Sequence, residues 1–307
     1  MIYTVTINPA LDYTLKVKSL DGSDINRSFD EAIYYGGKGI NVSVVLSRLG
    51  VRNKALGFLA GFTGDELERM LKADGIDCDF IRLESGMTRI NVKLISQKAL
   101  DINANGPEIK SDDIYKLIKK LKDNLKQDDY LILAGSAPTE LGEKTYERIL
   151  ECLDGKGIKS VVDASGGLLK STLKHKPFLI KPNRFELEEF FGVKIQNSDD
   201  AFYYAKKLQS QGAENVLISL GEDGALLLDS NGEKHKIKNA QGKAVNCVGC
   251  GDSMVAGFIA GYIKTNDYSY ALRLATACGN ATAYSPSLAE KENIFRLFDE
   301  LEKNYKE

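Results

Sequence analysis

The sequence has little net charge, few histidines and few prolines, and each shortage argues against a class of protein. A formal charge of -2 over 307 residues, with no basic stripe, argues against a nucleic-acid-binding surface. The only histidines, His175 and His235, are too few for a histidine-rich metal centre. Six prolines among 28 glycines argue against disorder and favour many tight turns. No stretch has the length and apolarity of a membrane-spanning helix, so no membrane is expected as a partner.

The cysteines are also too few and too scattered for a disulfide framework. They are Cys78, Cys152, Cys247, Cys250 and Cys278. An odd number without a secretory leader predicts reduced thiols and a cytoplasmic protein. Cys247 and Cys250 form a C-x-x-C, but no second pair or nearby histidine completes a zinc or redox set.

What the chain does have is an alternation of short apolar runs and helical patterns. Its composition, 43% hydrophobic and 27% charged, is that of a soluble globular enzyme. Apolar runs that lead into turn residues predict strands at residues 1–7, 55–59, 130–134, 160–163, 178–180, 216–219 and 225–228. Apolar residues three and four apart predict helices at residues 39–49, 65–74, 112–125, 140–153, 200–211, 252–264 and 271–284. The alternation predicts one α/β domain, residues 1–307, with a mostly parallel sheet and ligands at the strand ends.

Two stretches interrupt this alternation. Residues 12–35 show no convincing helical pattern, and residues 88–104 alternate in character, with Ile90, Val92 and Leu94 two apart. Period-two patterning is typical of strands with one face in water or against a partner. We therefore predict a small separate sheet, inserted twice into the α/β body, which would form a lid over the strand ends.

The strongest local motif is Gly249-Cys250-Gly251-Asp252, which leads directly into an apolar helical run. Backbone N–H groups converge at a helix N-terminus and bind anions, and glycines allow a phosphate to approach the main chain. Asp252 would place a carboxylate beside that pocket, where it could accept the proton of an attacking hydroxyl. The simpler alternative is that Asp252 is only a favourable first-turn acid, and the spacing alone favours this alternative.

Other nucleotide-binding motifs are not matched. A Walker A loop needs Gly-Lys followed by Ser or Thr, and no Gly-Lys pair in this chain continues in that way. A dinucleotide-binding fingerprint needs a third glycine, where this chain has Met254, and it would lie after the first strand. A Rossmann dehydrogenase is therefore disfavoured.

Four further motifs have both a structural and a functional interpretation. Gly36-Gly37-Lys38-Gly39-Ile40-Asn41 is a glycine-rich loop before a helix, or a ligand loop with a cation and an amide. Asp12 follows the first strand as a turn acid or a ligand. Asn183 and Glu186 have the spacing of a helix cap, or of an indirect magnesium site. Residues 219–224 form a glycine turn that a hairpin explains fully, or a loop beside a nucleotide.

The order of these motifs resembles that of the ribokinase-like carbohydrate kinase family, over nearly the whole chain. The family's two signatures correspond to residues 36–42 and 249–252, and Cys250 stands where the family usually has alanine. The backbone N–H of Cys250 remains available, so the anion hole should persist. The resemblance implies a three-layer α/β/α fold, ATP and Mg²⁺ as cofactors, and a lid that in many members pairs with a second lid to form a homodimer.

Within that family the chain is most similar to the 1-phosphofructokinase and tagatose-6-phosphate kinase branch, through residues 8–12, 56–64 and 88–93. The implied reaction is transfer of the ATP γ-phosphoryl to fructose 1-phosphate, giving fructose 1,6-bisphosphate. Asp101 departs from the branch, which usually has Glu before the following Ile-Asn. The alternatives are tagatose 6-phosphate or fructose 6-phosphate as substrate and, from another class, a non-catalytic sugar-phosphate sensor.

The resemblance also implies a role for each site residue. Asp252 would be the general base, and the backbone of Gly249, Cys250, Gly251 and Asp252 the anion hole. The sugar phosphate would be bound by Asp12, Gly37, Lys38, Asn41, Arg89, Asn103 and Ser136. ATP would be bound by Lys181, Asn183, Ser219, Leu220, Gly221, Glu222, Asp223, Gly224, Gly251 and Asn280. Glu186 would hold Mg²⁺ through water.

Overall fold

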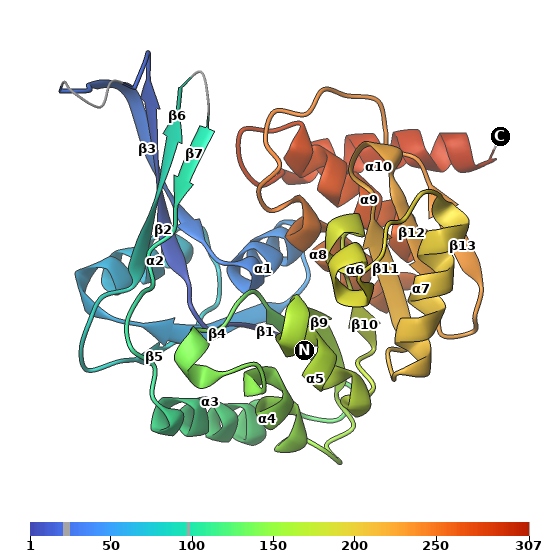
Figure 1. Ribbon diagram of the computed structural model, residues 1–307, viewed down its shortest axis with the longest axis horizontal. Coiled ribbons are helices and arrows are strands. Elements are labelled where there is room, and N and C mark those ends of the chain that lie inside the picture. The colour runs from blue at the N-terminus through green and yellow to red at the C-terminus, as the bar shows by residue number, and fades with distance from the viewer. Residues whose placement is uncertain (21–24, 97–98, 307) are drawn as a thin grey trace.

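The computed structural model describes residues 1–20, 25–96 and 99–306, which form a large sheet, a small sheet and surrounding helices (Figure 1). The large sheet has the strand order β13-β12-β11-β10-β9-β8-β1-β4-β5. Its strands are β1 (Ile2–Thr6), β4 (Asn53–Leu59), β5 (Ile81–Arg82), β8 (Tyr130–Ala134), β9 (Lys159–Asp163), β10 (Leu179–Ile180), β11 (Asn215–Ser219), β12 (Ala225–Leu228) and β13 (Lys234–Ile237). The pairs β11–β12 and β12–β13 are antiparallel and the other pairs of this sheet are parallel, so the prediction of a mostly parallel sheet is confirmed.

Helices cover both faces of the large sheet, because successive side chains of each strand point to opposite faces. Val5 and Leu131 pack into one core layer, whereas Ile2 and Ile132 pack into the other. The first layer is built with α3 (Ser111–Asn124), α4 (Thr145–Glu151), α5 (Gly166–Thr172), α6 (Arg184–Phe191) and α7 (Ser198–Ser210). The second is built with α1 (Lys38–Arg48), α2 (Gly61–Ala73), α8 (Cys250–Thr265), α9 (Tyr268–Ala283) and α10 (Lys291–Lys306). The three-layer α/β/α prediction is therefore confirmed.

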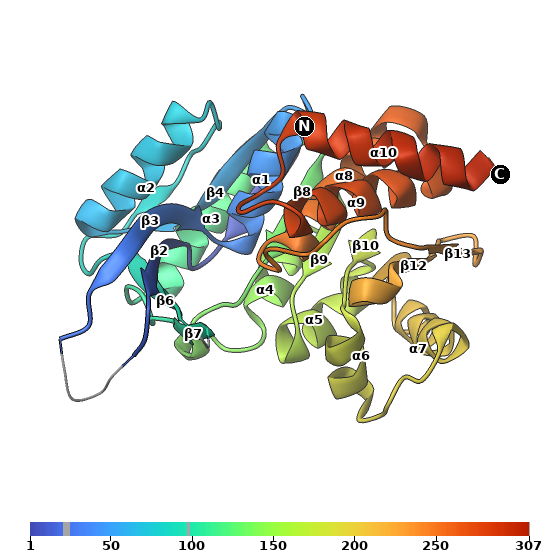
Figure 2. The same ribbon diagram turned by 90° about the horizontal axis from the view of Figure 1, so that it is seen from above.

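The small sheet stands beside this body, as Figure 2 shows from above. Its order is β3-β2-β6-β7, with β2 (Ala10–Val17), β3 (Ser28–Gly36), β6 (Arg89–Ile95) and β7 (Ala99–Ile102). Strand β2 follows β1 directly, and β3 leads directly into α1, so the small sheet is joined to the body beside the carboxyl end of β1. Residues 21–24 and 97–98 of the predicted lid segments lie outside the described residues.

Several sequence predictions differ from the structure. The helix predicted at residues 140–153 is confirmed only for Thr145–Glu151 (α4), because a 3-10 turn (Thr139–Leu141) ends at Gly142, whose φ of 74° is left-handed, before α4 begins. The patterns also missed α5, α10 and β13, which are short or rich in charged residues. Two further 3-10 turns span Leu173–His175 and Gly221–Asp223. Among the described residues, no helix has the length and apolar character needed to cross a bilayer.

Candidate active site

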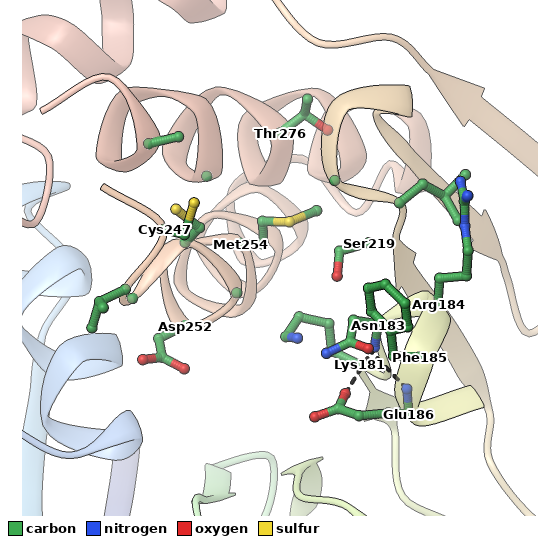
Figure 3. A pocket seen from close by; sticks show the side chains of 18 of the residues that line it. Lys181, Asn183, Arg184, Phe185, Glu186, Ser219, Cys247, Asp252, Met254 and Thr276 are labelled. Atoms are coloured by element: carbon green, nitrogen blue, oxygen red, sulfur yellow. Dashed lines mark hydrogen bonds between the residues drawn. The ribbon is translucent and has the colours of Figure 1, made fainter. Parts of the chain in front are cut away.

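A cleft of about 1790 Å³ opens at the carboxyl ends of the parallel strands (Figure 3). With one exception, every side chain or loop that the sequence predicted for the site lines this cleft. The exception is Asn103, which is exposed just after β7, at the outer edge of the small sheet, and is not among the lining residues. The structure therefore brings together residues from both ends of the chain, as parallel strands with crossover helices do.

The first turn of α8 forms one wall of the cleft. Gly249 precedes the helix with a left-handed φ of 80°, and the first backbone hydrogen bond of the helix runs from Ser253 N to Gly249 O. The amides of Cys250, Gly251 and Asp252 therefore have no partner in the helical ladder. Three N–H groups at the N-terminus of a 16-residue helix are suited to hold a phosphoryl group.

Asp252 is a buried carboxyl group at this helix start, with only 4% of its surface exposed. Its Oδ2 accepts a hydrogen bond of 2.8 Å from Asn41 Nδ2, so the amide that the sequence assigned to a sugar hydroxyl contacts Asp252 instead. Burial, and then the negative charge of Asp163, raise the pKa of Asp252 to about 6, although Lys38, Asn41 and Lys181 oppose the rise. A carboxyl group with a raised pKa is a better proton acceptor near neutral pH than an exposed one.

This raised pKa gives a pH prediction. A general base must be ionised, so kcat/KM should fall as the pH is lowered through about 6, the pKa of Asp252 in the folded protein. An exposed aspartate would retain activity to about pH 4. A pH–rate profile at saturating ATP measures the position of this acid limb; an unbroken plateau down to about pH 4 would contradict the assignment.

Two lysines meet below the cleft at one carboxylate that the sequence predictions missed. Lys38 Nζ lies 3.3 Å and Lys181 Nζ 3.5 Å from the same oxygen, Oδ1 of Asp163. Burial alone would lower the pKa of Lys38, but the carboxylates of Asp163, Asp252 and Glu186 together raise it. Lys38 therefore stays charged where an anionic substrate would bind. The signal available in the sequence was an acid at the carboxyl end of an apolar strand.

The small sheet contributes the opposite wall. Asp12, on β2, accepts a hydrogen bond of 2.8 Å from Asn91 and lies 3.3 Å from Lys93 Nζ. Arg89 donates to Ala104 O at 3.4 Å, and burial lowers its pKa. Asn91 and Lys93 were missed, although their period-two spacing with Arg89 places all three on one face of β6. Asp12, with these amino and amide groups, is suited to bind sugar hydroxyls and a phosphate.

The segment after β10 shows the predicted helix cap. Asn183 Oδ1 accepts from Glu186 N, and Glu186 Oε2 accepts from Asn183 N, both at 2.8 Å (dashed in Figure 3). This capping box satisfies two backbone donors at the start of α6. Glu186 Oε1 has no hydrogen-bond partner among the described residues, and Glu186 lines the cleft. The cap thus fixes a carboxylate that still has an oxygen to offer a cation.

The remaining residues that the sequence assigned to ATP form a loop and its support. Residues 219–224 join β11 and β12 as the predicted hairpin, which contains a 3-10 turn. Asn239 Nδ2 donates to Gly221 O at 2.8 Å, and Asn280 Nδ2 donates to Asn239 Oδ1 at 2.9 Å. Asn280 therefore positions the loop through Asn239, which the sequence predictions did not name.

The thiol of Cys250 lies in the wall formed by the first turn of α8 and donates to Asn246 O at 3.5 Å. Burial, followed by the nearby Cys247 and Asp252, raises the pKa of Cys250 to about 12, so the thiol stays protonated. A protonated, half-buried thiol is a poor nucleophile, and Cys250 takes part in the site through its backbone.

Comparison with known proteins identifies the family. The pfkB family of carbohydrate kinases matches residues 5–293. The chain belongs to this family. It is therefore a phosphotransferase with an alcohol acceptor, and its α/β body with a small sheet is the ribokinase-like fold.

Several members of the pfkB family that resemble this chain are named after a sugar phosphate. The chain is 42% identical to 1-phosphofructokinase of Bacillus subtilis, over 98% of both chains. It is 37% identical to D-tagatose-1-phosphate kinase of Bacillus licheniformis, over 96% of both chains. The solved structure of a candidate phosphofructokinase from Staphylococcus aureus superposes with a TM-score of 0.86 at 40% identity, covering 97% of both chains.

Proposed function

We propose that this pfkB-family kinase transfers the γ-phosphoryl group of ATP to the 6-hydroxyl of fructose 1-phosphate, giving fructose 1,6-bisphosphate and ADP. The observation that carries the proposal is Asp252, a buried carboxyl group with a raised pKa beside three amides that precede the helical hydrogen-bond ladder. Lys38 and Lys181 add positive charge at the same point. A base, an anion hole and two cations are the groups that phosphoryl transfer requires.

Each group has one task in this proposal. Asp252 accepts the proton of the 6-hydroxyl as the oxygen attacks, and the amides of residues 250–252 stabilise charge on the transferring group. Asp12 binds sugar hydroxyls, and Arg89 with Lys93 binds the sugar phosphate. Because phosphoryl transfer needs little covalent help from the protein, positioning dominates the rate.

The choice of sugar rests on the relatives. Both named relatives act on ketose 1-phosphates, and fructose and tagatose differ only in configuration at C4. Fructose 1-phosphate is favoured because the 1-phosphofructokinase has the higher identity, and tagatose 1-phosphate is the second candidate. The 6-phosphates of fructose and tagatose carry the phosphate at the other end of the sugar and are the third candidates.

The test is ADP release with Mg-ATP and each of the four ketose phosphates. We expect the highest kcat/KM with fructose 1-phosphate, followed by tagatose 1-phosphate. A higher value with either 6-phosphate would contradict the assigned orientation. Binding of a sugar phosphate without any ADP release would favour the sensor alternative.

We also propose that Glu186 holds Mg²⁺ through water, with the nucleotide between Lys181 and residues 219–224. The supporting observation is the carboxylate that its capping box fixes, with Oε1 facing no protein donor among the described residues. When bound, the ion neutralises charge on the ATP phosphates. The variant Glu186→Gln should need a higher Mg²⁺ concentration for half-maximal rate, whereas Glu189→Gln on the same helix should not. Equal Mg²⁺ dependence of the two variants would refute this role.

A homodimer through the small sheet completes the proposal. The small sheet exposes large apolar side chains, namely Phe29, Ile33, Leu100 and Ile102, each at least half exposed. Exposed apolar patches of this kind mark interaction surfaces. Light scattering should give a dimer for the unmodified chain and a monomer for Ile102→Asp; a wild-type monomer at micromolar concentration would reject the dimer.

A further inference from the structure

One carboxylate lies under the junction of the two halves of the cleft. Asp163 ends β9, and its side chain is only 1% exposed. Lys38 reaches it from the start of α1, next to the sugar side, and Lys181 reaches it from the segment after β10, next to the nucleotide side. The cations of the two half-sites therefore share a single oxygen, Oδ1 of Asp163.

The negative charge of Asp163 and the positive charges of Lys38 and Lys181 balance one another through this contact. Lys181 is itself only 4% exposed, so its ammonium group has little access to water. Oδ2 of Asp163 accepts no hydrogen bond from the described residues, so the two lysines are the groups that balance its charge. Burial opposes ionisation of Asp163, but Lys181 and Lys38 lower its pKa, so it stays negative. A buried carboxylate held by two cations fixes both of them in place.

We propose that Asp163 is a positioning residue that holds the sugar-side and nucleotide-side lysines together beneath the cleft. It does not line the cleft, so it acts through Lys38, Lys181 and its own field rather than by touching substrate. The inference rests on the proposed function, in which Asp252 is the base.

The field of Asp163 reaches Asp252 directly. The charged and polar groups that face Asp252 are Asp163 from β9, Lys38 and Asn41 from α1, Lys181 from beyond β10, and Cys250 from its own helix. After burial, the negative charge of Asp163 is the largest cause that raises the pKa of Asp252, and the lysines lower it. Removing the charge of Asp163 therefore removes a repulsion and leaves both lysines to stabilise ionised Asp252.

The test uses Asp163→Asn, which keeps the shape of the side chain and removes its charge. We expect the acid limb of kcat/KM to move by about one unit to lower pH, because a neighbouring charge shifts a pKa by at least that amount. The plateau rate should fall about 10²-fold, since displaced lysines misplace both phosphates. The matched control is Asp229→Asn, which removes an equally buried aspartate of the β12–β13 turn, outside the cleft, and should leave the profile unchanged.

A second variant should shift the acid limb of kcat/KM in the opposite direction. Lys181→Met removes a cation that lowers the pKa of Asp252, so it should move the acid limb to higher pH. Opposite shifts from two neighbouring variants do not arise from general loosening of the fold. Should Asp163→Asn not fold, the upward shift in Lys181→Met alone supports the charge network, and its absence overturns it.

A direct titration separates this inference from the proposed function. Carbon NMR of protein labelled at the aspartate carboxyl carbons follows the Asp252 resonance, which is assigned by its loss in Asp252→Asn. A lower pKa of Asp252 in Asp163→Asn supports the inference even if no sugar phosphate yields ADP, an outcome that would reject only the kinase assignment. An unchanged pKa of Asp252 in Asp163→Asn overturns the inference even in an active enzyme.

Discussion

Replacing Asp252 with asparagine should lower kcat by at least about 10²-fold while sugar-phosphate binding persists. The reason is that an amide cannot accept the proton of the 6-hydroxyl, although it fills the same space beside Asn41. Initial rates with Mg-ATP and fructose 1-phosphate, together with calorimetric titration of the sugar phosphate alone, measure the two quantities. Near-normal turnover in this variant would contradict the assignment of Asp252 as base.

A control variant separates this role from that of an ordinary first-turn acid. Asp199 lies in the first turn of α7, is exposed, and is not among the residues that line the cleft. Asp199→Asn should cost about 0.3–1 kcal/mol of stability through the helix dipole and leave kcat unchanged. Asp252→Asn should keep or raise the melting temperature, because burial raises the pKa of Asp252 and so disfavours its ionised form in the folded protein.

The second large effect is expected for Gly249→Ala. A Cβ at Gly249 would lie 2.6 Å from Cδ2 of Leu288, and the φ of 80° costs a non-glycine residue about 1–2 kcal/mol. The helix start should shift to relieve both, which would move the amides of residues 250–252 away from the transferring phosphoryl group. Loss of one such donor lowers kcat about 10²-fold or more, and steady-state kinetics with thermal unfolding would measure both effects.

Gly50→Ala is the matched control for this variant. Gly50 follows α1 with a similar φ of 76°, but no atom lies within 4 Å of its added Cβ and it is exposed. It should lose a similar amount of stability to backbone strain and keep full activity. Equal losses of activity in the two variants would mean that the effect of Gly249→Ala is not local to the anion hole.

The sequence predicted which residues line the cleft where a motif combines a turn with a charged group. Gly249 to Asp252 and Gly37 to Asn41 were identified because glycines beside a helix start let an anion approach the backbone amides closely. Asp163 was missed because an acid at a strand end has no local pattern that shows its partners, which lie 125 and 18 residues away as Lys38 and Lys181. Contacts between distant segments follow from sheet order, and sequence periodicity does not give that order.

The helices and strands also divide into those that local sequence patterns predict and those that they miss. Strands β8 and β12 agree with their predicted bounds, because buried parallel or hairpin strands are short apolar runs with clear ends. Helix α10 was missed because its many charged residues hide the apolar positions Ile294, Leu297 and Leu301, which are buried against the second core layer. Asn103 was assigned to the sugar by its neighbours in sequence, but it follows the edge strand β7 and is exposed, whereas the next residue, Ala104, contacts Arg89 and Asn91 through its backbone.

The small sheet is attached to the body at the place where the sugar is proposed to bind. Ala10 at the start of β2 pairs with Gly36 at the end of β3 and with Arg89 at the start of β6, so three of the four connections to the body meet beside Asp12 and Lys38. Lys181 and residues 219–224, in contrast, belong wholly to the large-sheet body. A rotation of the small sheet about this attachment would therefore act first on the sugar side of the cleft. A change in the angle between the sheets would alter affinity for the sugar phosphate and leave affinity for the nucleotide nearly constant.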